Sequence, residues 1–352
     1  MQTATIPKPT NSPRERTRAK IQVGNHSEQQ SKLVYIGGSG HSGSTLLDLL
    51  LGGHSMISAL GEVHRIYLCA NRQAKVHWCY CGKHVLQCPM WLSVAEQLQQ
   101  LLRRGDPQIL KRHVTTDPAY LKLEEADEYN LMEEEPVTYS FSLNKMLLAA
   151  GSSALWKAGA LISSDVRFRQ RVIQNSLLLY EAVRRACNTP IVVDATKDPS
   201  RLKGLYLASP DCFRLLYLTR DGRAVCRSRM KRQQMTMEDC AKIWLAEQRK
   251  QWLARLTIPN RQIIWARYED ICTSPIDQLT RICRELDLTY EPDMLDFRQR
   301  NRHNIGGNPM RFRQHEQSIR IDERWRRELS REDLATFNRI AGRMNEYLGY
   351  AT

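Results

Sequence analysis

The stretch Gly37-Gly-Ser-Gly-His-Ser-Gly-Ser-Thr-Leu46, written GGSGHSGSTL, joins the apolar run LVYI at 33–36 to the apolar segment LLDLLL at 46–51. This order predicts a buried strand, a tight glycine-rich turn and the first turns of a helix. The free backbone N–H groups of a helix start, together with the positive end of its dipole, favour a bound anion. We therefore expect this stretch to form a phosphate-binding loop.

Two widespread nucleotide-binding patterns fit this loop incompletely. The dinucleotide pattern GxGxxG is matched by Gly38, Gly40 and Gly43, with Glu62 near the distance expected for a ribose-binding acid. The Walker pattern is matched at its glycines, but Ser44 stands where its phosphate-binding lysine belongs. A third possibility is a loop for a phosphate that carries a sulfuryl group, in which a basic residue precedes the Ser-Gly-Ser-Thr turn.

The composition is that of a basic globular protein. The 352 residues are 42% hydrophobic, and 52 lysines and arginines against 38 acidic residues give a formal charge of +14. This charge favours an anionic ligand, nucleic acid or an acidic surface as partner. No apolar run reaches membrane-spanning length, and ten cysteines without an apolar leader favour a reduced, cytoplasmic protein. Residues 1–31 predict a disordered basic tail, with an RNA-binding arm at 13–20 as the alternative.

Apolar, β-branched segments alternate with helical patterns along the rest of the chain. The spacing of apolar residues predicts helices over 165–187 and 237–256. This alternation predicts an α/β fold with a parallel sheet, whose ligands bind beyond the carboxyl ends of the strands. Residues 92–165 contain no clear strand and predict a helical insertion that caps the sheet, with an ordinary solvated helical layer as the alternative. The expected strands are Leu33–Ile36, Pro190–Val193, Phe213–Leu218 and Gln262–Ala266.

A second motif of the same kind follows the third expected strand. The segment YLTRDGRAVCRS at 217–228 is again a strand end, a turn and a helix start, with Arg220 and Ser228 eight residues apart. If Ser228 lies about two turns into the helix, its hydroxyl and the Arg220 guanidinium converge on a second phosphate. The compound 3′-phosphoadenosine 5′-phosphosulfate (PAPS) carries phosphate on both sides of its ribose and meets this demand. An arginine and a serine that only cap and solvate the helix are the alternative.

Together the two motifs resemble the sulfotransferase family. The segment GSGHSGSTLL is similar to its 5′-phosphosulfate loop and LTRDGRAVCRS to its 3′-phosphate motif, while RYEDICTSP at 267–275 and HNIGGNPMRF at 303–312 resemble further segments. The pair Gly61-Glu62 resembles the branch that includes tyrosylprotein sulfotransferases and many bacterial enzymes. The resemblance implies a three-layer, P-loop-like α/β fold with a central parallel sheet, in one sulfotransferase domain over 32–352. The insertion over 92–165 is expected to form part of the acceptor site.

The resemblance also implies roles for three residues in sulfuryl transfer. Glu62 corresponds to a general base that takes the proton of the acceptor, with the nearby His64 as second candidate. Lys197 in VVDATKDPSRL resembles the lysine of an Asn-Lys-Asp-Pro motif, and this implies that it meets the sulfuryl and bridging oxygens. His41 stands where most relatives have lysine or arginine, so leaving-group assistance is expected to rest more on Lys197 or to depend on pH. For Glu62 and Lys197 the alternative is an ordinary surface or structural residue.

The expected donor site combines residues from all of these motifs. Ser44 and Thr45 are expected to bind the 5′-phosphate through hydroxyl and backbone N–H groups. Tyr268 resembles a residue that contacts adenine, and Arg311 is expected to close over the 3′-phosphate, with packing roles as the alternative. The donor-binding residues are thus expected to be Gly40, His41, Ser42, Gly43, Ser44, Thr45, Leu46, Arg220, Ser228, Tyr268 and Arg311.

The sequence thus predicts a PAPS-dependent sulfotransferase that modifies a hydroxyl or an amine and needs no metal. The acceptor is expected to be a small metabolite, with neither nucleic acid nor a membrane as partner. A P-loop small-molecule kinase and a non-catalytic nucleotide- or RNA-binding protein are the alternatives. The identity of the acceptor and the oligomeric state are left open.

A cluster of cysteines and histidines lies outside these motifs. Cys69 and His77 precede the segment WCYCGKHVLQCPMW at 78–91, which contains Cys79, Cys81, His84 and Cys88. The density suits zinc, but CxC followed by a cysteine seven residues later lacks the paired CxxC spacing of structural zinc sites. We interpret these cysteines as reduced packing residues, with zinc or a disulfide as alternatives.

Overall fold

The computed structural model describes residues 31–66, 78–104, 164–297, 302–308, 312 and 318–351. The chain divides into two compact units, residues 1–30 and 31–352, and every described residue belongs to the second. The following parts of the sequence predictions therefore lie outside the described residues: residues 1–30 of the basic tail, residues 105–163 of the insertion, Cys69, His77 and Arg311.

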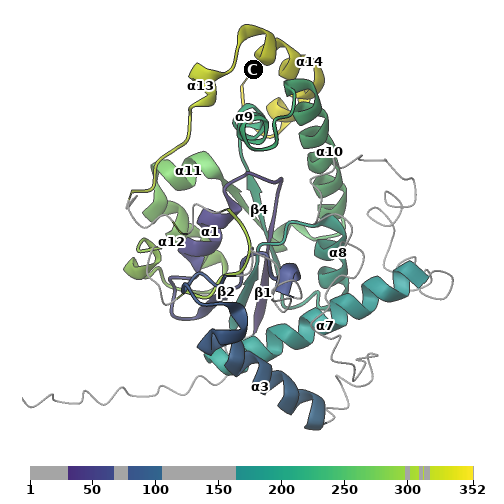
Figure 1. Cartoon of the computed structure of the whole chain (residues 1–352), viewed down its shortest axis with the longest axis vertical. Helices are drawn as coiled ribbons and strands as arrows, with labels where there is room; N and C mark the ends of the chain where they lie inside the picture. Colours follow the sequence, from purple (N-terminus) through teal and green to yellow (C-terminus); the bar gives the residue numbers. More distant parts are fainter. Residues whose placement is uncertain are drawn as a thin grey trace, which may run out of the picture. The chain divides into compact units, whose positions relative to one another are not determined.

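A five-stranded parallel sheet forms the centre of the second unit (Figure 1). The strands are β1 (Lys32–Gly37), β2 (Ile57–Ala59), β3 (Ile191–Asp194), β4 (Phe213–Thr219) and β5 (Ile263–Arg267). They lie in the order β2-β3-β1-β4-β5, and Tyr35 of β1 is paired with Asp194 of β3 and Leu215 of β4. Because neighbouring strands are parallel, the loops after β1, β3 and β4 meet at one edge of the sheet.

Helices cover both faces of the sheet, because successive side chains of each strand point into different hydrophobic cores. In β1, Leu33 and Tyr35 belong to one core, and Val34 and Ile36 belong to the other. The first core is closed by α3 (Pro89–Arg104), α7 (Ser164–Cys187), α8 (Pro199–Ala208) and α10 (Met237–Arg255). The second is closed by α1 (Ser44–Leu51), α11 (Tyr268–Thr273) and α12 (Pro275–Glu285). Figure 1 shows these helices on opposite sides of the strands, which gives the fold three layers.

A third, smaller hydrophobic core joins α10 to α9 (Gly222–Gln233) and α14 (Arg331–Tyr347). Trp244 and Phe337 pack there with their ring centroids 5.6 Å apart. The remaining elements are α13 (Trp325–Glu328), η1 (Val63–Arg65), η2 (Val85–Gln87), η5 (Asn260–Gln262) and η6 (Pro292–Met294). Among the described residues, none of the helices combines the length and the apolar character needed to cross a lipid bilayer.

The sequence predictions of the α/β fold are confirmed. All four expected strands are present with ends that differ by at most one residue, and α7 and α10 follow the expected helices equally closely. The structure adds β2, which was not predicted because three residues are too few to show a pattern. Helix α3 covers residues 92–104 of the expected helical insertion.

Candidate active site

The loop between β1 and α1 has the backbone geometry of an anion-binding turn. Gly43 precedes α1 with φ 93°, and no side chain caps this helix start within the described chain. A Cβ atom on Gly43 would come within 2.4 Å of the Tyr268 ring, and one on Gly38 within 2.4 Å of the Leu218 carbonyl oxygen. Glycine is therefore required at both positions by conformation and by space.

Polar groups in and around this loop are available to a ligand. The hydroxyl oxygens of Ser39 and Ser42 are buried and have no hydrogen-bond partner among the described residues, and the same holds for Arg220 Nε. Buried polar atoms are normally paired, because leaving one unpaired costs free energy. Hydroxyl, guanidinium and uncapped backbone N–H groups are all donors, so the loop fits a bound phosphate or sulfate ester.

Arg220 reaches from the end of β4 to this loop. Its Nη1 donates to the backbone oxygen of His41 at 3.0 Å, and its Nη2 donates to the backbone oxygen of Asp322 at 3.1 Å. The guanidinium carbon lies 4.2 Å from the centre of the Tyr268 ring, and Nη2 lies 3.6 Å from the Asp322 carboxylate. Arg220 and Tyr268, predicted from separate motifs, therefore contact each other beside the loop.

His41 and Ser228 also lie together, with 3.3 Å between His41 Nδ1 and Ser228 Oγ. Ser228 is the seventh residue of α9, which agrees with the expected two turns. Burial, followed by the positive charge of Arg229, lowers the pKa of His41 from 6.5 to about 4. The imidazole is therefore neutral at pH 7 and provides one N–H donor but no charge.

The two residues expected to carry the chemistry form an ion pair. Lys197 Nζ lies 2.7 Å from Glu62 Oε1 and 3.1 Å from the backbone oxygen of Ala195, and both charged side chains are about one-seventh exposed (14% and 15%). Glu62 follows β2 and Lys197 follows β3, so adjacent strands deliver them to the same edge of the sheet. The second base candidate, His64, instead contacts Thr196 Oγ1 at 3.2 Å.

Buried hydrogen bonds hold Lys197 in place. Its φ of 69° is unusual for a residue with a side chain. The preceding residue, Thr196, donates from its backbone N–H and its hydroxyl to Asp194 Oδ1, at 2.8 Å and 2.5 Å. The amide Nε2 of Gln251 on α10 donates to the backbone oxygens of Lys197 and Gly38. Gln251 thereby ties the loop after β1 to the loop after β3.

The segment 302–308 connects the residues that follow β2 to the start of α1. Ile305 pairs with the residues next to Glu62, and the backbone N–H of Glu62 donates to the Ile305 oxygen at 2.8 Å. At its other end, the backbone N–H of Asn308 donates to Thr45 Oγ1 at 3.0 Å. One segment therefore positions both the expected general base and the first turn of α1.

A buried carboxyl group, that of Asp48, also holds this segment through a hydrogen bond. Asp48 of α1 accepts hydrogen bonds from the Asn304 amide and, at 3.2 Å, from the backbone N–H of Gly61. Burial raises the pKa of this carboxyl from 3.8 to about 7, and the two hydrogen bonds oppose the rise. Asp48 thus links α1 to the Gly-Glu pair.

The structure brings most of the predicted site residues together around the loop after β1. Leu46 differs from the others, because its side chain is buried in the second hydrophobic core. Gly40 approaches Arg229, where an added Cβ would lie 3.2 Å from Nη2. Arg311 lies outside the described residues, so its role stays a prediction.

Sequence reasoning missed Gln251, Asn304 and Asn308. Gln251 and Gln248 are both buried on α10, and polar residues among the apolar positions of a helix are a signal that could have found Gln251. Asn304 and Asn308 lie in the quoted HNIGGNPMRF segment, but their partners Asp48 and Thr45 are more than 250 residues away in sequence. Only the fold identifies such pairs.

Three comparisons with known proteins were made. A search of curated protein sequences found no match. Among solved structures, the chain is similar to a sulfotransferase domain of the curacin biosynthetic pathway, with 15% identity over 92% of this chain and 99% of that chain and a TM-score of 0.46. It is also similar to the sulfotransferase domain of the Synechococcus PCC 7002 olefin synthase, with 17% identity over 93% and 98% of the two chains and a TM-score of 0.45. For a sulfotransferase from Mycobacterium avium the identity is 13%, the coverage is 92% and 77%, and the TM-score is 0.42.

The family comparison gives the clearest result. The sequence profile described as "Sulfotransferase family" matches residues 34–292, which include β1 from its third residue, the other four strands in full, the glycine-rich loop, Glu62, Lys197 and Arg220. Since the match covers well over half of the chain, this protein belongs to the sulfotransferase family.

Proposed function

We propose that this protein moves the sulfuryl group of PAPS to a hydroxyl or an amine of a small-molecule acceptor, within a domain that spans residues 32–352. The observation that carries the proposal is the 2.7 Å contact between Lys197 Nζ and Glu62 Oε1. It joins a cation and a proton acceptor beside an anion-binding loop. Sulfuryl transfer needs one of each, because negative charge develops on the leaving side while a proton leaves the acceptor.

The donor would be bound from both sides of its ribose. The uncapped start of α1 and the Ser42 hydroxyl suit the 5′-phosphosulfate, since these donors are without partners among the described residues. Arg220 and Ser228 suit the 3′-phosphate. Arg220 faces the Asp322 carboxylate at 3.6 Å, so a phosphate would compete with that carboxylate for the guanidinium.

The reaction forms one bond to sulfur and breaks another. The acceptor oxygen or nitrogen attacks, its new bond to sulfur forms, and the bond from sulfur to the 5′-phosphate oxygen breaks to release adenosine 3′,5′-bisphosphate. Glu62 takes the proton of the acceptor, and Lys197 stabilises charge on the sulfuryl and bridging oxygens. His41 is neutral at pH 7 in the ligand-free protein and assists only through its N–H group.

Ligand-induced thermal stabilisation tests the donor class. Adenosine 3′,5′-bisphosphate should stabilise the protein strongly, by about 2.7 kcal/mol at a hundredfold excess over its Kd. ATP and NAD at equal concentration should shift the melting temperature far less, since neither has a 3′-phosphate. Equal shifts with ATP would favour the kinase alternative and contradict the proposal.

Transfer itself is tested by incubating the protein and PAPS with a small-molecule cell extract. Mass spectrometry should find products that are heavier by one SO₃ group and that depend on both PAPS and active protein. The Glu62→Gln variant is the matched control, because it should keep the donor site and lose the base. A bisphosphate-binding protein that modifies nothing in such extracts would support the non-catalytic alternative.

A further inference from the structure

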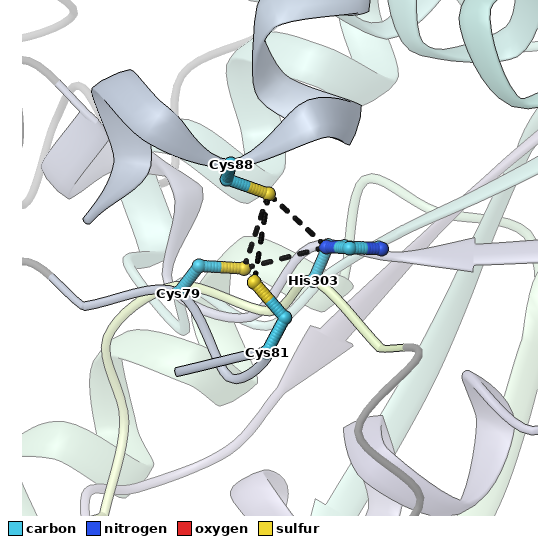
Figure 2. Close-up of side chains that lie close together, drawn as sticks. All are labelled: Cys79, Cys81, Cys88 and His303. Atoms are coloured by element: carbon cyan, nitrogen blue, oxygen red, sulfur yellow. Dashed lines mark hydrogen bonds between the residues drawn. The ribbon is translucent and has the colours of Figure 1, made fainter. Parts of the chain in front are cut away.

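Three cysteines and one histidine converge at a place that the proposed reaction does not use. Cys79, Cys81, Cys88 and His303 each point one ligand atom at a common centre, and these atoms all lie within 4.8 Å of one another (Figure 2). Cys79 and Cys88 are buried, and Cys81 and His303 are partly buried. The sequence analysis did not include His303 in the cysteine and histidine cluster, because it lies 215 residues beyond Cys88.

All six distances between the four ligand atoms are within 4.8 Å, and four of them can be compared with the edges of a tetrahedron around a metal. Zinc–sulfur bonds of about 2.3 Å and zinc–nitrogen bonds of about 2.0–2.1 Å give edges of roughly 3.8 Å for S···S and 3.6 Å for S···N. The observed separations are 3.6 Å for Cys79 to Cys88, 3.8 Å for Cys81 to Cys88, 3.6 Å for Cys79 to His303 and 3.1 Å for Cys88 to His303. Three of these four edges lie within about 0.2 Å of the ideal value, and the fourth is shorter.

The same distances argue against a disulfide and against ordinary packing. A disulfide needs sulfur atoms about 2.05 Å apart, and any pairing here would leave the third thiol unpaired. Packing cysteines are usually surrounded by apolar groups. Here the Nδ1 atom of His303 faces the sulfur atoms of Cys79 and Cys88 instead.

The backbone presents these ligands from two separate parts of the chain. Cys79 and Cys81 lie in a tight turn, where Gly82 has φ 84° and donates its N–H to the Cys79 oxygen at 2.9 Å. Cys88 directly precedes α3. The fourth ligand, His303, is held by Trp91 of α3, whose Nε1 donates to the His303 oxygen at 3.1 Å.

We propose that Cys79, Cys81, Cys88 and His303 bind one zinc ion in a closed structural site. Thiolate and imidazole ligands favour zinc over hard cations such as magnesium or calcium. Four protein ligands fill a tetrahedral site and leave no position for water or substrate, so the ion does not take part in sulfuryl transfer. The site joins the turn at 78–88 and α3 to the segment 302–308.

This link gives the metal a role in the geometry of the neighbouring site. Among the described residues, the secondary structure of segment 302–308 is limited to the isolated bridge between Ile305 and Gly61, so regular secondary structure contributes little to holding it. His303 lies two residues before Ile305, whose backbone pairs beside Glu62. A bound zinc would anchor this segment at its start and thereby stabilise the loop that carries Glu62.

The metal content of the purified full-length protein tests the proposal. Elemental analysis should find about one zinc per chain, and a strong chelator should release it and expose three thiols to a thiol reagent. Cys81→Ser and His303→Ala should lower zinc affinity more than the about 10- to 100-fold cost of losing a hydrogen-bond partner of a ligand. The matched controls Cys212→Ser and His84→Asn, which lie outside the four-residue cluster, should keep the full zinc content.

Cobalt substitution keeps the test informative if a variant fails to fold. Wild-type protein loaded with Co²⁺ should show thiolate-to-cobalt charge transfer and the visible bands of a tetrahedral site. The proposal is overturned if folded wild-type protein supplied with zinc binds no stoichiometric metal and gives no such spectrum. A disulfide among Cys79, Cys81 and Cys88 in peptide maps of freshly purified protein would overturn it as well. None of these measurements depends on sulfotransferase activity.

Discussion

Segment 302–308 contacts two regions of different chemical character. Towards Asn308 it meets the loop after β1, where the hydroxyls of Ser39 and Ser42 are buried and without partners among the described residues. At His303 it meets the cysteine cluster, where each ligand atom faces the other three. The first region keeps hydrogen-bond donors available for a ligand that binds and dissociates. In the second region the polar atoms face one another, which is the arrangement expected of a structural metal site.

This comparison predicts different consequences of mutation in the two regions. A substitution in the loop region should change ligand binding or turnover and leave the zinc content as it is. A substitution of a cluster ligand should lower the zinc content directly. Activity should fall only indirectly, to the extent that segment 302–308 no longer holds the loop region in place. Each prediction that follows should therefore be measured with both readouts, transfer and zinc content.

The largest effect is expected for Glu62→Gln. Glutamine keeps the size of the side chain but cannot take a proton, so turnover should fall about 100-fold or more while bisphosphate affinity stays close to that of wild type. Single-turnover transfer beside calorimetric binding measures this. Glu291→Gln is a control, because that carboxylate contacts Ser55 and His54, away from the loop. Near-wild-type transfer by Glu62→Gln would move the base to another residue, with His64 as the next candidate.

Lys197→Met should reduce turnover by about 100-fold, because it removes charge that is needed as the bond to the leaving phosphate breaks. Methionine keeps an aliphatic stem, and the backbone strain of a φ of 69° is about the same for methionine as for lysine, since neither is β-branched. PAPS should bind more weakly, whereas the bisphosphate product, which lacks the sulfuryl group, should bind almost normally. Lys242→Met on the exposed surface of α10 is the matched control. If both ligands weaken equally, Lys197 contacts the nucleotide and not the sulfuryl group.

Arg220→Ala should weaken the bisphosphate by about 2 kcal/mol, or about 30-fold in Kd, which is the scale of a hydrogen bond to a charged group. The loss has two parts, since the guanidinium also supports His41 and stacks on Tyr268. Arg220→Lys should recover part of the affinity, because it restores charge without the planar fork. Calorimetry on both variants separates the lost charge from the lost contacts with His41 and Tyr268. Arg214→Ala is the control, because this β4 residue donates to the nearby backbone oxygens of Asp211 and Phe213. An unchanged Kd would remove Arg220 from the phosphate site.

The two regions also differ in how far the sequence predicts them. Four of the strands and the loop were predictable, because those strands are mostly apolar runs and each phosphate motif follows one of them directly. The contact between Glu62 and Lys197 was not, although both residues were identified, because it arises from the adjacency of β2 and β3. β2 itself spans three residues and is defined by its pairing with β3 alone.

The cluster shows the opposite case. Its cysteines were noticed but interpreted as packing residues, because CxC followed by a cysteine seven residues later lacks the paired CxxC spacing of structural zinc sites. His303, the residue of the cluster that the sequence did not identify, comes from a C-terminal segment that forms a backbone bridge to Gly61 through Ile305. A metal site that draws one ligand from so far along the chain has no local sequence signature.

The smallest effect concerns pH and His41. Burial and the neighbouring charges of Arg229, Arg232, Lys197 and Arg220 hold the pKa of His41 near 4 in the folded protein, against 6.5 when unfolded. Between these two values the unfolded chain binds more protons than the folded one, so His41 costs stability progressively as pH falls from about 6.5 to about 4. Below about pH 4 both states are protonated and the cost stays constant.

His41→Asn isolates this contribution, because asparagine accepts the left-handed φ of 62° at this position and does not titrate. Wild-type profiles alone mix two effects, since Asp48 has a raised pKa of about 7 and adds stability as pH falls through the same range. The difference in melting temperature between variant and wild type cancels the Asp48 term and should grow in favour of the variant by about 2 °C between pH 7 and pH 4.5. Saturating bisphosphate should shrink this difference, because bound phosphate favours the protonated imidazole. A difference that is constant with pH would show that His41 does not titrate in this range, and a difference that bisphosphate leaves unchanged would place His41 away from the anion.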